Sequence, residues 1–238
     1  MVREALIRNV GKEQHKGASR IRDFILGWQD GLVNVLGVIL GVAAATNQVR
    51  VVLIAGLAAT FAESISMMAV AYTSFKAEAD LYKSEMAREE REVRDVPATE
   101  KKEVTSIFRH MGFSGSLLNA AVKRITSNKH RWVMMMMENE LKLSPPKHSP
   151  LNIGMIVGFS AFVGSLIPLG PFIFLPVQTA VVVSLLISTV VLFFVGAYKS
   201  HTTVGSPLRG GVEMAAIGMM AALIGYAVGS VFGAVITG

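Results

Sequence analysis

The 238-residue chain contains no cysteine and few charged residues. Without cysteine it cannot form disulfides, thiolate metal sites or a cysteine nucleophile. Charged residues make up 17% of the sequence and hydrophobic residues 52%, whereas a soluble domain is typically about 25% charged. This composition excludes an ordinary soluble domain and indicates a membrane protein.

The chain also lacks the residue patterns of common enzyme classes. It has no histidine pair at metal-ligand spacing, no glycine-rich phosphate-binding loop and no plausible Ser/His/Asp set. The first 23 residues are polar and contain no apolar core or cleavage site, so we expect no signal peptide. The net charge of +6 could suggest nucleic acid, but its distribution follows membrane topology instead. We therefore expect neither an enzyme nor a nucleic-acid-binding protein.

Five apolar segments are long enough to span a bilayer, which requires roughly 20 residues each. The connection between the third and fourth segments, IPLGPFIFLP, has three prolines that we expect to break the helix. In the fifth segment, Gly225, Gly229 and Gly233 form a stripe of small residues suited to close helix packing. The fold class is therefore an all-α membrane protein with five transmembrane helices, at residues 24–46, 51–73, 151–172, 175–198 and 212–236.

Lysine and arginine are distributed unevenly among the connections. Residues 1–23 carry six, residues 74–150 carry fourteen and residues 199–211 carry two, whereas the other two connections carry one and none. Because positive charge accumulates on the cytoplasmic side, we expect a cytoplasmic N-terminus and a C-terminus on the opposite side. An odd number of spans gives no simple inverted repeat, so a central pathway is expected between the subunits of a homodimer.

The sequence divides into three parts: residues 1–73 with the first two spans, a cytoplasmic helical domain at 74–150, and residues 151–238 with the last three spans. The second span is expected to continue as one helix until Pro97, where a new helix starts. After a turn at 112–115, a third helical stretch is expected to run until the two prolines at 145 and 146.

Acidic and methionine side chains recur at helical spacing in this polar domain. Glu89 and Glu92 share a helix face, and Met136 and Met137 lie one turn before Glu140. Carboxylates are hard ligands and thioethers soft ones, so a mixed set favours Fe²⁺, Mn²⁺, Co²⁺ or Zn²⁺ over Ca²⁺ or Mg²⁺. Two alternatives stay open, because glutamates among arginines often form a solvated face and methionine runs often serve packing.

Two carboxylates lie inside apolar segments. Asp30 is the only ionisable residue between Phe24 and Ala45, and Glu63 lies near the middle of the second segment. Charges at bilayer depth are costly and usually functional, and neither segment contains a basic residue to neutralise them. Asp30 and Met67 fall at similar depth in antiparallel helices and so form a candidate transit site. Glu63 is expected deeper in the membrane, where it would carry a proton or form a second binding site for the ion. The alternative is that both acids only hydrogen-bond a neighbouring helix.

These stretches resemble the vacuolar iron transporter family. The resemblance is carried by ILGWQDGLVNVLGVILG, AGLAATFAESISMMAVAYTSFKAEADL, MENEL and LIPLGPF. It implies a homodimer of five-span subunits that moves Fe²⁺, and often Mn²⁺, out of the cytoplasm in exchange for protons, with no permanent cofactor. It also implies that Asp30 and Met67 hold the ion in transit, and that the cytoplasmic ligands are Glu89, Glu92, Glu100, Glu103, Met136, Met137 and Glu140.

The sequence departs from that family at the end of the second span. Many relatives have Gly-Glu-Tyr or Gly-Asp-Tyr there, whereas this chain has Val70-Ala71-Tyr72. One acidic group at the cytoplasmic mouth is therefore missing, and Glu63 is the candidate to compensate. The departure bears on ion preference and proton coupling more than on the fold.

The sequence as a whole predicts a divalent metal transporter embedded in the lipid bilayer. Its membrane would be the cell membrane in a prokaryote and an organelle (vacuolar) membrane in a eukaryote. Two rival hypotheses remain: a membrane protein that senses or stores metal without flux, and a membrane scaffold whose acidic helices bind a partner.

Overall fold

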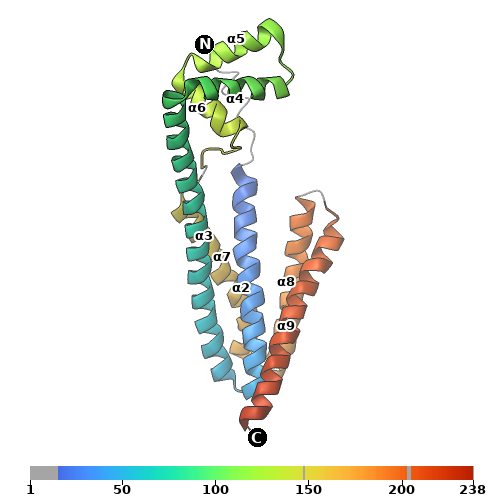
Figure 1. Cartoon of the computed structure of the whole chain (residues 1–238). Helices are drawn as coiled ribbons and strands as arrows, with labels where there is room; N and C mark the ends of the chain where they lie inside the picture. Colours follow the sequence, from blue (N-terminus) through green and yellow to red (C-terminus); the bar gives the residue numbers. More distant parts are fainter. Residues whose placement is uncertain (1–15, 147, 203–204, 238) are drawn as a thin grey trace, which may run out of the picture. The chain divides into compact units, whose positions relative to one another are not determined.

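The structure is a computed structural model that describes residues 16–146, 148–202 and 205–237 (Figure 1). Within these ranges every regular element is an α-helix, which confirms the all-α prediction. The helices are α2 (Lys16–Thr46), α3 (Val49–Asp95), α4 (Pro97–His110), α5 (Gly115–Thr126), α6 (Lys129–Asn139), α7 (Pro150–Phe174), α8 (Val177–His201) and α9 (Pro207–Thr237).

The chain forms two compact units. The first comprises residues 1–72 and 151–238, and the second comprises residues 73–150. Helix α3 contributes its first half to the first unit and its second half to the second unit. As the sequence predicts, α3 continues without a break until Asp95, immediately before Val96 and Pro97.

Five helices of the described chain are long and apolar enough to cross a membrane: α2, α3, α7, α8 and α9. Large apolar side chains on these helices lie on the outside of the unit, including Ile54, Phe159 and Phe194, each at least 65% exposed. Exposure of such apolar side chains to water is unfavourable, whereas contact with lipid tails is not. The chain is therefore a membrane protein with five candidate spanning helices.

The connection between α7 and α8 differs from the sequence prediction. Pro168 and Pro171 lie inside α7, and only Pro176 lies at the break, where it caps the start of α8. Membrane helices tolerate internal proline because neighbouring helices and hydroxyl side chains satisfy the disturbed backbone. Ser184 of α8 donates a hydrogen bond to the carbonyl oxygen of Pro168, at 2.7 Å, and so links α8 to this part of α7. The prediction of a break was thus wrong for the first two prolines.

The glycine stripe of α9 packs directly against α2. A Cβ atom at Gly229 would overlap the carbonyl oxygen of Gly41, and one at Gly225 would overlap that of Gly37. At Gly233 the added atom would lie 2.6 Å from the Cα atom of Ala45, which is also on α2. Only glycine allows two backbones to approach this closely, so the predicted packing role is confirmed and its partner is α2.

The second unit has its own apolar core, contributed by α3, α4, α5 and α6. Its third helical stretch is two helices: α5 ends at Thr126, and Asn128 caps the start of α6 by accepting a hydrogen bond from the Arg131 amide at 3.0 Å. Helix α6 then ends at Asn139, and Lys142 adopts a left-handed conformation with φ of 57°. The prediction of one helix running to Pro145 was therefore right at its start but wrong in the middle, where the helix is interrupted, and at its end.

Candidate metal centre

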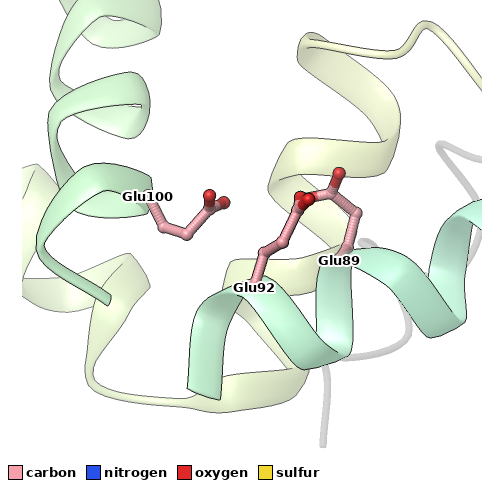
Figure 2. Close-up of side chains that lie close together, drawn as sticks. All are labelled: Glu89, Glu92 and Glu100. Carbon is pink, nitrogen blue, oxygen red and sulfur yellow. The ribbon is translucent and has the colours of Figure 1, made fainter. Parts of the chain in front are cut away.

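Three glutamates from two helices converge in the second unit. Glu89 and Glu92 lie one turn apart on α3, and Glu100 lies in the first turn of α4. One carboxylate oxygen of each lies within 4.8 Å of the others. Figure 2 shows the three carboxyl groups directed toward one another. The break at Val96, with Pro97 at the start of α4, changes the direction of the chain and brings the first turn of α4 close to the last turns of α3.

Two of these glutamates are buried without complete hydrogen bonding. The side chains of Glu89 and Glu100 belong to residues only 2% and 4% exposed. The Oε2 atom of each has no hydrogen-bond partner among the described residues. A buried carboxylate oxygen without a donor is costly, and natural proteins usually satisfy it with a donor or a cation. These two orphaned oxygens are therefore open to a proton or to a cation.

The glutamates also affect one another electrostatically. Burial, followed by the charge of Glu140, raises the pKa of Glu89 to about 7. Burial, followed by the charge of Glu103, raises the pKa of Glu100 to about 7. The pKa of Glu140 is raised by loss of water and by Glu103. The structure thus brings all five predicted glutamates, including Glu92, into one electrostatic group.

The spacing of the three closest oxygens suits a divalent cation. Two oxygens on opposite sides of an ion, each bonded at about 2.1 Å, lie roughly 4.2 Å apart. The three oxygens lie within 4.8 Å of one another, so they must move closer together to bind one ion at the same time. Carboxylate oxygens alone would accept Mg²⁺ or Ca²⁺ as well, so discrimination among metals requires further ligands.

The two predicted methionine ligands lie in the core of the second unit. Met136 and Met137 are both 0% exposed and pack with Trp132 and other apolar residues of this core. Glu140 follows them as the C-cap of α6, where its amide donates to the Met136 carbonyl oxygen at 2.9 Å. Their role as sulfur ligands stays a prediction.

One residue of the centre, Arg88, was not identified as part of the site from the sequence. It lies on α3 beside the cluster and forms ion pairs with Glu85, Glu89 and Glu92. Its spacing of four residues from Glu92 is the signal that could have revealed it, because residues four apart share a helix face.

In the first unit, the acids of α2 and α3 meet. The carboxyl groups of Asp30 and Glu63 lie within hydrogen-bonding reach of each other. Asn34, one turn after Asp30, donates a hydrogen bond to Oε1 of Glu63 at 3.1 Å. We expected Glu63 to lie deeper in the membrane than Asp30, as a proton carrier or a second binding site for the ion, but it lies beside Asp30. The two acids are nearly equidistant along the chain from the turn at Asn47, and antiparallel helices bring such residues together.

Two further candidate groups lie on the same two helices. Met67 lies one turn beyond Glu63 on α3 and is partly buried. Asp23 lies seven residues before Asp30, on the same face of α2, and is 5% exposed with an Oδ2 atom that has no partner in the described chain. Asp23 was not predicted from the sequence, although its seven-residue spacing from Asp30 places both acids on one helix face.

Glycines hold α2 in place around Asp30. A Cβ atom at Gly27 or Gly31 would overlap the backbone of α7, at Val157 and Ala161 respectively. This close approach fixes the turn of α2 that carries Asp30 against its neighbour.

Comparison with known proteins identifies the family. The model of the VIT family matches residues 21–230. Vacuolar iron transporter 1 of Arabidopsis thaliana is 34% identical over 222 residues, covering 92% of this chain and 89% of the relative. Vacuolar iron transporter 1 of Tulipa gesneriana is 30% identical over 226 residues, covering 94% and 92%. The vacuolar iron transporter of Plasmodium falciparum is 28% identical over 232 residues, covering 93% and 85%. The resemblance seen in the sequence is thus confirmed, and the chain belongs to the VIT family.

Proposed function

We propose that this protein exports divalent iron, and also Mn²⁺, from the cytoplasm in exchange for protons. The relatives named vacuolar iron transporters support a metal-transporting role. They also agree with the prediction that the chain is not an enzyme. The observation that carries the proposal is the convergence of Glu89, Glu92 and Glu100 with two orphaned, buried oxygens.

The first step of the proposed mechanism is capture of the metal by the glutamates of the second unit. Glu89, Glu92 and Glu100 supply the closest oxygens, and Glu103 and Glu140 add negative charge. Met136 and Met137 would add the soft ligands that favour Fe²⁺ over Mg²⁺. Because a metal binds the ionised carboxylates, capture near neutral pH displaces protons from the cluster.

The second step is passage through the membrane at the acids of the first unit. Two carboxyl groups within hydrogen-bonding reach can bond each other only when one of them carries a proton, as Asp30 and Glu63 would. An entering metal ion that binds both carboxylates must release that proton, and reprotonation releases the metal. Met67 would supply a thioether to the dehydrated ion. This alternation of metal and proton on one pair of acids constitutes the antiport.

The proposal extends to the assembly and the membrane. Two copies of the chain would form a homodimer with the pathway between them, the N-terminus in the cytoplasm and the C-terminus on the other side. The names of the relatives favour a vacuolar membrane in a eukaryotic cell. A chain from a prokaryote would occupy the cell membrane. The partners are therefore a second subunit, metal ions, protons and lipid.

The decisive experiment measures Fe²⁺ and Mn²⁺ flux into proteoliposomes that contain the full chain, under an imposed pH gradient. We expect flux that the gradient accelerates and that Asp30→Asn abolishes. If Asp30→Asn transports metal like the parent, Asp30 is structural and the mechanism is wrong. Metal binding without any flux would instead establish the sensing or storage alternative. Absence of both binding and flux would favour the membrane scaffold.

A further inference from the structure

Arg88 contacts the glutamate cluster from one side. Its guanidinium donates to Glu85 at 2.8 Å and to Oε1 of Glu89 at 3.3 Å. Its Nη1 atom lies 3.7 Å from Oε1 of Glu92. All four residues lie on consecutive turns of α3, so the helix itself sets this arrangement.

The contact with Glu89 divides the two oxygens of that carboxylate. Oε1 faces Arg88, whereas Oε2 is buried and has no partner among the described residues. A metal ligand is commonly arranged in this way: one atom binds an orienting donor and the other is left for the ion. Glu100 contributes a second orphaned oxygen from α4 to the same cluster.

A rigid planar cation suits this role better than a flexible one. The fork of an arginine can hold several carboxylates at fixed angles, whereas the ammonium of a lysine acts as a point charge. Arg88 also offsets the repulsion among the glutamates. Burial and the neighbouring glutamates raise the pKa of Glu89 and Glu140, and the positive charge of Arg88 opposes this rise. Its side chain is 43% exposed, so these ion pairs contribute little to the stability of the fold.

We propose that Arg88 is a positioning residue of the metal centre. It holds Glu89 and Glu92 from outside, so that their free oxygens are presented to the incoming ion. This inference rests on the proposed metal-binding function of the cluster. Loss of a comparable orienting partner typically weakens metal binding by about 10- to 100-fold. We therefore expect Arg88→Gln to raise the Kd for Mn²⁺ by that factor, and to raise the metal concentration for half-maximal flux while leaving maximal flux unchanged.

The test uses the purified full chain and Mn²⁺, whose binding is followed by calorimetry and by electron paramagnetic resonance. Arg94→Gln is the matched control, because it removes the same charge from the same helix but pairs with the exposed Asp95 at 2.9 Å. We expect Arg94→Gln to bind like the parent and Arg88→Lys to recover part of the lost affinity. We also expect the Mn²⁺ spectrum of Arg88→Gln to change in shape, which a merely structural role would not cause.

A second variant protects the test against misfolding. Glu85→Gln removes the closest partner of Arg88 without touching a candidate ligand, and we expect a smaller loss of Mn²⁺ affinity. The inference is overturned if Arg88→Gln binds Mn²⁺ like the parent. If Arg88→Gln does not fold, the inference is overturned if Arg88→Lys and Glu85→Gln both bind like the parent. An equal loss in Arg94→Gln overturns it too, because the effect is then one of net charge. If the parent itself binds no Mn²⁺, the proposed function fails instead.

Discussion

Asn34 of α2 donates a 3.1 Å hydrogen bond to Glu63 of α3. This bond holds Glu63 at the turn of α2 that also carries Asp30, whose carboxyl group lies within hydrogen-bonding reach. One amide and two carboxyl groups from two antiparallel helices therefore form a single polar site among apolar segments. Such a site is costly in a bilayer, so its retention points to a function.

The first prediction concerns Glu63→Gln. Glutamine keeps an oxygen to accept the Asn34 hydrogen bond but cannot give up a proton, so we expect metal flux to lose its dependence on the pH gradient. We expect the rate to fall about tenfold, which corresponds to roughly 1.4 kcal/mol. Metal uptake and the internal pH of proteoliposomes should be recorded together. Glu213→Gln, at an exposed acid of α9, is the control and should leave both signals unchanged.

The second prediction concerns the pH dependence of metal binding by the glutamate cluster. Glu89 and Glu100 have pKa values of about 7, raised mainly by burial. Above pH 7 both are ionised and ready to bind, whereas below pH 7 an ion must displace a proton from each. We therefore expect affinity to fall by up to about 100-fold per pH unit below 7 and to level off above it. Calorimetry in buffers of different ionisation enthalpy should detect the released protons; a flat profile between pH 6 and 8 would contradict this account.

The third prediction separates the two roles of the buried methionines. Leucine has nearly the volume of methionine, so Met136→Leu and Met137→Leu should each cost less than about 1.5 kcal/mol of stability. If the sulfurs bind the ion, each variant should bind Fe²⁺ more weakly while its affinity for Mg²⁺ stays the same. Competition binding on the full chain measures both ions. Unchanged Fe²⁺ affinity in both variants would assign these residues to packing alone.

The fourth prediction concerns the contact between α2 and α9. Gly229→Ala would place a methyl group against the carbonyl oxygen of Gly41, so the two helices must separate. Such overpacking typically costs about 1–3 kcal/mol. Gly170→Ala, at a glycine of α7 with no atom within 4 Å of the added group, is the matched control. Thermal unfolding in detergent should show a lower midpoint for Gly229→Ala only.

Where sequence prediction succeeded, the determining forces were local. Apolar runs of sufficient length define the five candidate spans, because a bilayer requires each helix to satisfy its own backbone. Pro97 sets the end of α3 and the start of α4 because it lacks an amide hydrogen. The spacing of Glu89 and Glu92 fixes their common face on one helix.

Where sequence prediction failed, a neighbouring element changed the outcome. Pro168 and Pro171 remain inside α7, where surrounding helices tolerate them. Asn128 caps α6 and so divides the stretch expected to be one helix. The position of Glu63 beside Asp30 depends on how α2 and α3 pack, which the pattern of either helix alone does not specify.

The sequence by itself determined the spans, the helix break before Pro97 and the chemical types of the candidate ligands, since these depend on hydrophobicity and local backbone chemistry. Only the tertiary structure decided that Glu100 of α4 meets Glu89 and Glu92 of α3, and that Arg88 takes one oxygen of Glu89 and leaves the other free. The first relationship arises from the way two separate helices meet, which residue spacing along one helix cannot encode. The second lies within α3, where spacing brings the residues together but side-chain directions decide which oxygen Arg88 contacts.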